Sequence, residues 1–264
     1  MCNKLRVSVV QYLNTVPLIW GMQHGEQQGK FDLNFTTPAQ CADAVRSGSA
    51  GVGIIPAIEV QRIEDLQVIH GVSISSLERV KSVILLSKTP IERISSVALD
   101  TSSRTSVALV TILLRKFYNL QPRMTPADPD PEKMLAQADA ALLIGDPALA
   151  FNGRRVRIYD LAAEWRKFTG LPFVFAVWAG PRKAGLSKFS RDFQESRDYG
   201  LAHIGEIAAE YAPRHGMTPD EVKIYLTENI NYNLDDKHRE GLDLFYRLAR
   251  EQGLIPAVTE VTFV

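Results

Sequence analysis

Short apolar strands alternate with helices along the chain, and this alternation occurs in two successive blocks. The strands predicted for the first block lie at residues 5–10, 31–36, 52–55, 66–70 and 80–86. Those predicted for the second block lie at 96–99, around 124, at 140–144, 156–159 and 172–178. After Gly180 the pattern predicts only helices, at 187–212, 218–228 and 235–252. Strands and helices that alternate in this way are typical of α/β proteins with parallel sheets.

Two such blocks, with no low-complexity segment between them, predict two lobes in this chain of 264 residues. We expect the chain to cross between the lobes in two extended segments, Leu86–Thr89 and Phe173–Trp178. The first lobe then comprises residues 1–88 and 175–264, with the C-terminal helices packed on it, and the second comprises residues 89–174. This is the architecture of type II periplasmic binding proteins. Ligands of open α/β sheets bind at the carboxyl ends of the strands, which here would face a cleft between the lobes.

Charge and cysteine content exclude several classes of protein. Lys and Arg number 30 and Asp and Glu number 30, so the surplus of cations that a nucleic-acid-binding protein needs is missing. The two cysteines, Cys2 and Cys41, cannot build a disulfide framework, and we expect two reduced thiols. No apolar run approaches the ~20 residues that cross a bilayer, and Met1–Arg6 carries no signal-peptide core. We therefore predict a cytoplasmic protein with no nucleic-acid or membrane partner.

Motifs for metal ions and nucleotide cofactors are missing as well. The sequence has no His-Glu-x-x-His, Walker or Gly-x-Gly-x-x-Gly pattern, and no two of its five histidines are spaced like a metal site. His70 ends a predicted strand and is the one histidine expected near the cleft, where a structural role is favoured over catalysis. We therefore expect neither a metal ion nor a cofactor.

Polar residues gather at the turns between strands and helices, where a cleft ligand would bind. Asn14 follows the first strand and offers an amide that can both donate and accept a hydrogen bond. Ser82 lies in an apolar strand, so its hydroxyl either bonds locally or points into the cleft. Gly145 and Asp146 follow the strand at 140–144. Capping of the next helix explains Asp146 completely, whereas Gly145 would allow a ligand close to the backbone.

The turn at 100–106 is the best candidate for an anion site. Three hydroxyl residues and Arg104 stand there before a long buried helix, which is more than one N-cap requires. Free N–H groups at a helix start favour an anion, and Arg can hold a carboxylate with two hydrogen bonds. An exposed cation in a first helical turn is unfavourable by ~0.3–1 kcal/mol, which a bound carboxylate would offset. Simple capping is the alternative.

Four of these segments, taken together, resemble one family. Tyr-Leu-Asn-x-x-Pro-Leu at 12–18, Arg-Val-x-Ser-Val at 79–83, Asp-x-Ser-Ser-Arg-Thr-Ser at 100–106 and Ala-Leu-Leu-Ile-Gly-Asp-Pro-Ala at 141–148 look like the chorismate dehydratases, in order and spacing. The resemblance implies a lyase of the futalosine route to menaquinone with a type II binding-protein fold. It also implies loss of water from chorismate, a dianion, to give 3-[(1-carboxyvinyl)oxy]benzoate. Aromatisation drives this reaction, so no cofactor is needed.

The resemblance further implies roles for single residues. A carboxylate of the substrate takes the ring proton, and Asn14 stands at the position of an Asn that orients this carboxylate. Ser82 would bind the substrate from the first lobe, and the turn at 101–104 would hold a carboxylate from the second. The candidate substrate-binding residues are Ser82, Thr101, Ser102, Ser103, Arg104, Gly145 and Asp146.

Two other functions stay open at this point. A sister family with the same fold makes 1,4-dihydroxy-6-naphthoate; its pattern includes a His in the second lobe, and this chain has none between His70 and His203. A non-catalytic solute-binding protein is usually exported, and no export signal is found. The C-terminal helices could form the surface of a homodimer, although packing onto the first lobe is the simpler account.

Overall fold

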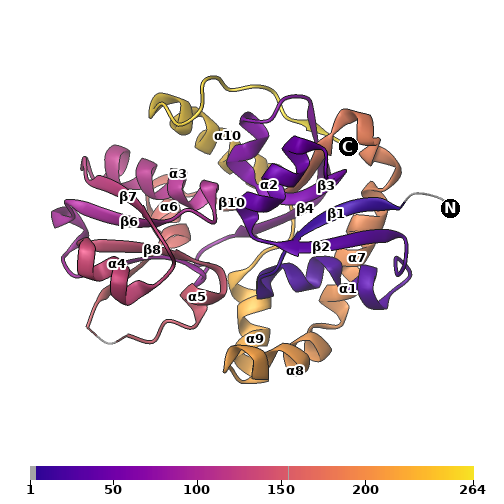
Figure 1. Cartoon of the computed structure of the whole chain (residues 1–264), viewed down its shortest axis with the longest axis horizontal. Helices are drawn as coiled ribbons and strands as arrows, with labels where there is room; N and C mark the ends of the chain where they lie inside the picture. The colour runs from indigo at the N-terminus through magenta and orange to yellow at the C-terminus, as the bar shows by residue number, and fades with distance from the viewer. Residues whose placement is uncertain (1–3, 154) are drawn as a thin grey trace.

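The computed structural model describes residues 4–153 and 155–264, so the thiol predicted for Cys2 lies outside the described residues. Figure 1 shows two lobes side by side, with both chain ends on the same lobe. Cys41 is a buried free cysteine, as the sequence predicts. Within the described ranges, no helix is long and apolar enough to cross a membrane.

The sheet of the first lobe has six strands in the order β11-β4-β10-β3-β1-β2. Its strands are β1 (Leu5–Val10), β2 (Phe31–Thr36), β3 (Val52–Pro56), β4 (Leu66–Ser76), β10 (Phe173–Pro181) and β11 (Thr262–Phe263). Strand β1 runs parallel to β2 and β3, whereas β10 runs antiparallel to β3 and β4. The long apolar run of β10 fits a strand that is buried among its neighbours. Strand β11 has two residues and was not predicted.

The sheet of the second lobe has five strands in the order β7-β6-β8-β5-β9. Its strands are β5 (Val83–Ser87), β6 (Ser96–Asp100), β7 (Arg123–Ala127), β8 (Ala140–Ile144) and β9 (Arg157–Asp160). The sequence-based boundary at 88 placed β5 in the first lobe, but β5 pairs antiparallel with β8 and β9. The first crossover therefore lies at 77–82 and not at Leu86–Thr89. A strand that is apolar on both faces does not reveal from sequence which sheet it joins.

Helices cover both sheets. Those of the first lobe are η1 (Leu13–Thr15), α1 (Val16–His24), α2 (Pro38–Ser47), η2 (Ala57–Gln61), η5 (Arg182–Ala184), η6 (Leu186–Lys188), α7 (Ser190–Ala202), α8 (Ile204–His215), α9 (Pro219–Ile224), the π-helical turn η7 (Tyr225–Asn229) and α10 (Asp236–Glu251). Those of the second lobe are η3 (Ile91–Arg93), α3 (Arg104–Ile112), the π-helical turn η4 (Leu113–Phe117), α4 (Pro131–Gln137), α5 (Gly145–Leu149) and α6 (Leu161–Thr169). The helix predicted at 187–212 is thus two helices that meet at His203, and α6 was not predicted.

The C-terminal helices pack mainly on the first lobe, as expected. Helix α7 lies against α1 and β4, and α10 lies against β10, with a further contact to α3 of the second lobe. The second crossover lies at 170–172 and not at Phe173–Trp178, because Phe173 already pairs with β4 in the first sheet. An aromatic cluster fixes it, because Trp165 of α6 packs edge-to-face on Phe173 and Phe245. The Trp165 indole also donates a hydrogen bond of 3.2 Å to the Pro172 carbonyl. These contacts hold the two lobes at a defined angle around the space between them.

Candidate functional site

A small cavity of about 40 Å³ lies between the two lobes. It is lined by Val10, Tyr12, Asn14, Pro38, Pro56, Ile74, Val80, Ser82, Val83, Ser103, Ser106, Ile144, Gly145, Phe175 and Ala176. These residues come from the carboxyl ends of β1, β3, β4 and β8, from the starts of α2, α3 and β5, from the first crossover and from β10. The cavity therefore occupies the place where open α/β sheets bind ligands.

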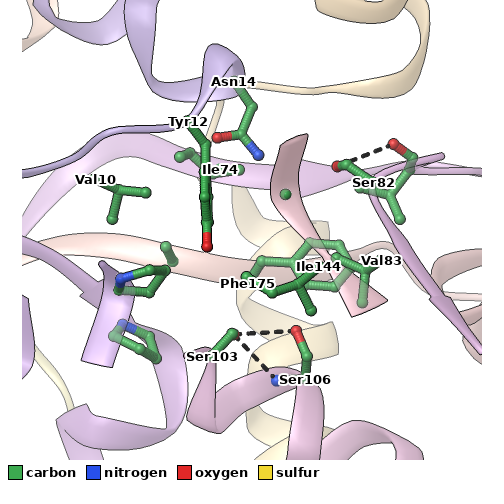
Figure 2. A pocket seen from close by; sticks show the side chains of 15 residues that line it. Val10, Tyr12, Asn14, Ile74, Ser82, Val83, Ser103, Ser106, Ile144 and Phe175 are labelled. Atoms are coloured by element: carbon green, nitrogen blue, oxygen red, sulfur yellow. Dashed lines mark hydrogen bonds between the residues drawn. The ribbon is translucent and has the colours of Figure 1, made fainter. Parts of the chain in front are cut away.

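The turn after β1 sends Tyr12 and Asn14 into the cavity. The backbone N–H of Thr15 closes this turn on the Tyr12 carbonyl at 3.0 Å, which begins the short helix η1. Figure 2 shows the Tyr12 ring reaching across the cavity, with Asn14 beside it on the same turn. The Asn14 side-chain oxygen accepts a hydrogen bond of 3.3 Å from the Thr15 hydroxyl. Asn14 thus lies in the cavity where the sequence expected it.

Ser82 is fully buried in the first crossover and lines the cavity. The residue before it, Lys81, adopts a left-handed φ of 59°, so the backbone turns sharply there. The Asp160 carboxylate fixes this turn, because it accepts hydrogen bonds from the N–H groups of Val80 at 3.0 Å and Lys81 at 2.7 Å. The Ser82 hydroxyl accepts a hydrogen bond of 2.8 Å from the phenol of Tyr225. Sequence reasoning missed Tyr225 as a site residue, because it lies 143 positions from Ser82.

The start of α3 forms the second-lobe wall of the cavity. Ser103 caps this helix, and its hydroxyl oxygen accepts hydrogen bonds from the backbone N–H of Ser106 at 3.4 Å and from the Ser106 hydroxyl at 3.0 Å (Figure 2). Both hydroxyl groups line the cavity at the positive end of the helix dipole. Ser106 was not among the predicted residues, although it stands in the same motif.

Two other predicted members of this turn lie outside the cavity lining. Thr101 is exposed. The Ser102 hydroxyl donates a hydrogen bond of 2.6 Å to the buried Asp100 carboxylate and lies 3.5 Å from the Tyr12 hydroxyl. Burial raises the pKa of Asp100, and the hydrogen bonds from Ser102 offset part of this rise. Ser102 therefore contacts the hydroxyl group of Tyr12 from outside the cavity lining.

Arg104 does not lie where the sequence analysis placed it. Its guanidinium points away from the cavity and donates hydrogen bonds of 3.0 Å to the Glu59 carboxylate and 2.9 Å to Asp43, both in the first lobe. Glu59 is 1% exposed and also pairs with Arg46 and Arg62. The expected partner of this cation was a carboxylate, and the structure supplies two from the protein itself. Arg104 thus links the lobes beside the cavity.

Gly145 and Asp146 form a second link between the lobes. Gly145 lines the cavity with a φ of 64°, and a Cβ atom there would lie 2.6 Å from the Tyr12 ring. The sequence analysis expected a ligand to lie close to the Gly145 backbone, and in the structure the Tyr12 ring lies there. The Asp146 side chain does not cap α5; it accepts a hydrogen bond of 3.1 Å from the Leu13 N–H in the other lobe. Burial raises the pKa of Asp146, which is outside the cavity lining.

Only neutral groups line the cavity among the residues that the structure describes. An anionic ligand there would be met by hydroxyl and amide donors and by the N-terminus of α3, with apolar walls around them. His70 is exposed on β4 and does not line the cavity. Residues 4–153 and 155–264 contain no group of three or more His, Cys, Asp or Glu placed to hold a metal ion. The absence of a cofactor stays a prediction.

Comparison with known proteins shows to which family this chain belongs. The family described as "Menaquinone biosynthesis" matches residues 5–251. The chorismate dehydratase of Thermus thermophilus is 32% identical over 254 residues, covering 89% of this chain and 91% of that protein. The chorismate dehydratase of Campylobacter jejuni is 28% identical over 166 residues, covering 62% of this chain and 63% of that protein.

Solved structures show the same fold at low sequence identity. Protein AF1704 from Archaeoglobus fulgidus superposes with a TM-score of 0.77 at 18% identity, covering 96% of this chain and 98% of that one. The alkanesulfonate-binding protein SsuA from Xanthomonas axonopodis has a TM-score of 0.67 at 16% identity, covering 96% and 94%. The predicted periplasmic-binding-protein fold is thus confirmed. The family match covers most of the chain, and the two curated relatives are chorismate dehydratases. The chain therefore belongs to the menaquinone biosynthesis family.

Proposed function

We propose that this chain is a chorismate dehydratase, which eliminates water from chorismate to give 3-[(1-carboxyvinyl)oxy]benzoate. One observation carries this proposal. The cavity brings together Asn14, Ser82 and the capped start of α3 from three distant segments, in a chain 32% identical to a chorismate dehydratase. Asn14, Ser82 and Ser103 are among the residues that the family resemblance assigned to the substrate.

The reaction needs positioned donors more than a separate acid–base pair. A ring C–H bond breaks at the carbon that carries the ether oxygen, and its electrons form a double bond as the neighbouring C–O bond breaks. The proton passes to a carboxylate of the substrate, which gives it to the departing hydroxide, so that water leaves and the carboxylate is ionised again. The protein contributes orientation and preorganised electrostatics. Asn14 orients the substrate carboxylate that takes the proton.

Two ends of the cavity offer different groups for binding the substrate. The Ser103 hydroxyl, which accepts from Ser106, and the N-terminus of α3 are the donors available to one carboxylate. Ser82 is the donor available from the first crossover. Tyr12 and Phe175 supply flat apolar walls for a six-membered ring. The proposal includes the cytoplasmic location and a metal- and cofactor-free reaction.

Incubation of the purified chain with chorismate tests this function. The expected result is a product lighter by one water, detected by mass, with loss of the diene absorbance and growth of a benzoate chromophore. Unchanged chorismate, under conditions in which a known chorismate dehydratase converts it, would contradict the proposal. Binding of chorismate without conversion would instead favour a solute-binding protein.

A further inference from the structure

Tyr225 is a buried phenol that contacts the site from outside the cavity. Its side chain is 1% exposed, and it begins the π-helical turn η7 of the first lobe. Its hydroxyl donates a hydrogen bond of 2.8 Å to the Ser82 hydroxyl oxygen. Because Tyr225 does not line the cavity, any effect on a ligand passes through the residues that it holds.

The direction of this hydrogen bond decides what Ser82 can do. A hydroxyl group has one proton to give and accepts through its oxygen. Since the Ser82 oxygen accepts from Tyr225, its own proton is directed elsewhere. The acceptor within the protein is the Val80 carbonyl at 3.4 Å, which is long for an O–H···O bond. An anionic oxygen in the cavity would be a better acceptor for this proton, and the donation from Tyr225 would strengthen that bond.

The Tyr225 phenol remains a donor across the neutral pH range. Burial raises its pKa above the ordinary value, and hydrogen bonds with Ser82 and Asn14 lower it by less. Ser82 is thus held at one end of the cavity by a group that is shielded from solvent.

The π-helical turn places a second side chain on the same crossover. The Asn229 amide, at the other end of η7, donates a hydrogen bond of 3.2 Å to the Arg79 carbonyl. Tyr225 and Asn229 thus hold the segment at 79–82 at two points. π-helical turns are rare and occur frequently at functional sites, because they redirect side chains that a regular helix would place elsewhere.

We propose that Tyr225 is a positioning residue for the reaction, an inference that rests on the proposed function. By donating to Ser82, it sets the Ser82 hydroxyl as a donor to an anionic oxygen of the substrate.

Kinetics of Tyr225→Phe, Ser82→Ala and the double variant test this proposal with chorismate as substrate. Loss of one directed hydrogen bond to an anion is expected to raise KM about fivefold in Tyr225→Phe, with kcat within about twofold of wild type. In the Ser82→Ala background, the same change is expected to alter KM less than about twofold, since the residue through which Tyr225 acts is gone.

Tyr246→Phe is the matched control. Its phenol is equally buried and donates a hydrogen bond of 2.8 Å to the carbonyl of Ala57, which does not line the cavity. It should lower thermal stability by a similar amount and leave KM unchanged. An unchanged KM in Tyr225→Phe, or an equal rise in both backgrounds, would overturn the positioning role. If Tyr225→Phe does not fold, the double variant is compared with Ser82→Ala alone, because removing both hydroxyl groups leaves neither without its partner. Different KM values of these two variants would then overturn the positioning role. A wild-type chain that does not convert chorismate would instead refute the proposed function.

Discussion

At the scale of single residues, a neutral cavity can hold a dianion only through donors that point in the right direction. Asn14, Ser82 and Ser103 are such donors, and none of them carries a formal charge. Their effect depends on the surrounding apolar wall, which keeps water from competing for the same oxygens. Small changes of geometry at these residues should therefore alter catalysis more than changes of charge on the surface do.

Asn14→Ala is expected to lower kcat at least about tenfold and to change KM less, because the amide orients the group that takes the proton. The measurement is the rate of product formation under saturating chorismate. Asn34→Ala is the control, since Asn34 is exposed on β2 and does not line the cavity. A turnover of Asn14→Ala equal to wild type would refute the role given to Asn14.

Gly145→Ala is expected to lower kcat/KM at least about tenfold. An Ala at this φ of 64° is strained by ~1–2 kcal/mol, and its Cβ would also displace the Tyr12 ring. Gly170→Ala separates the two effects: Gly170 has a φ of 71° with no atom within 4 Å of the added Cβ. Both variants should lose thermal stability. Equal activities of the two variants would show that the contact with Tyr12 is not needed.

At the scale of elements, α3 meets the first lobe through a charge cluster beside the cavity. Arg104 is the second-lobe member of this cluster, and it faces the buried Glu59 and the more exposed Asp43. Glu59 would keep Arg46 and Arg62 as partners if Arg104 were lost. The cluster therefore joins the lobes without leaving an uncompensated buried charge when they separate.

Arg104→Ala is expected to raise KM about threefold and to leave kcat within about twofold, since a partly exposed ion pair contributes up to ~1 kcal/mol to the contact between the lobes. Steady-state kinetics measure this change. Arg46→Ala is matched, because Arg46 pairs with the same two carboxylates but stays within the first lobe. An equal rise of KM in Arg46→Ala would mean that Arg104 does not act by joining the lobes.

Local sequence patterns predicted most helices and strands, but they did not predict contacts between residues far apart in the sequence. Apolar runs revealed β1, β3, β6 and β8, because each is buried on both faces. Helix α6 was missed, although Asp160 caps its start and Gly170 ends it, because its apolar face is short. The sheet to which β5 belongs depends on pairing with β8 and β9, which local periodicity does not encode.

The site was predictable to the same degree. Asn14, Ser82, Ser103 and Gly145 line one cavity, because each stands at a strand end or crossover that the fold brings together. The partners of Arg104 lie 45 and 61 positions away in the sequence, so no local signal identified them. Asp146 looked like a helix cap, and its actual partner, the Leu13 N–H, lies 133 positions away.

At the scale of the whole molecule, the contact between Asp146 and Leu13 joins the lobes opposite the Arg104 cluster. Burial raises the pKa of Asp146, while the Leu13 N–H and the charge of His215 act in the other direction. A carboxyl group with a raised pKa binds a proton more readily in the folded chain than in the unfolded one. Its contribution to stability therefore falls as pH rises above the usual Asp pKa of about 3.9.

Asp146→Asn is expected to make the protein more stable at pH 7, because the amide oxygen can still accept from Leu13 without a buried charge. The gain should shrink as pH falls towards about 4, where the wild-type carboxyl also becomes neutral. Urea unfolding at several pH values measures both effects. Asp32→Asn, on the exposed edge of β2, should show no gain. A less stable Asp146→Asn at pH 7 would contradict this account.

The split make-up of the first lobe has a consequence for how the protein is made. Strands β5 to β9 and their helices leave the ribosome before β10, which pairs with both β3 and β4 in the first sheet. The second lobe can therefore complete its sheet during translation, whereas the sheet of the first lobe is incomplete until β10 has been synthesised. Tyr225 emerges later still, so a nascent chain gains its working site only near the end of synthesis.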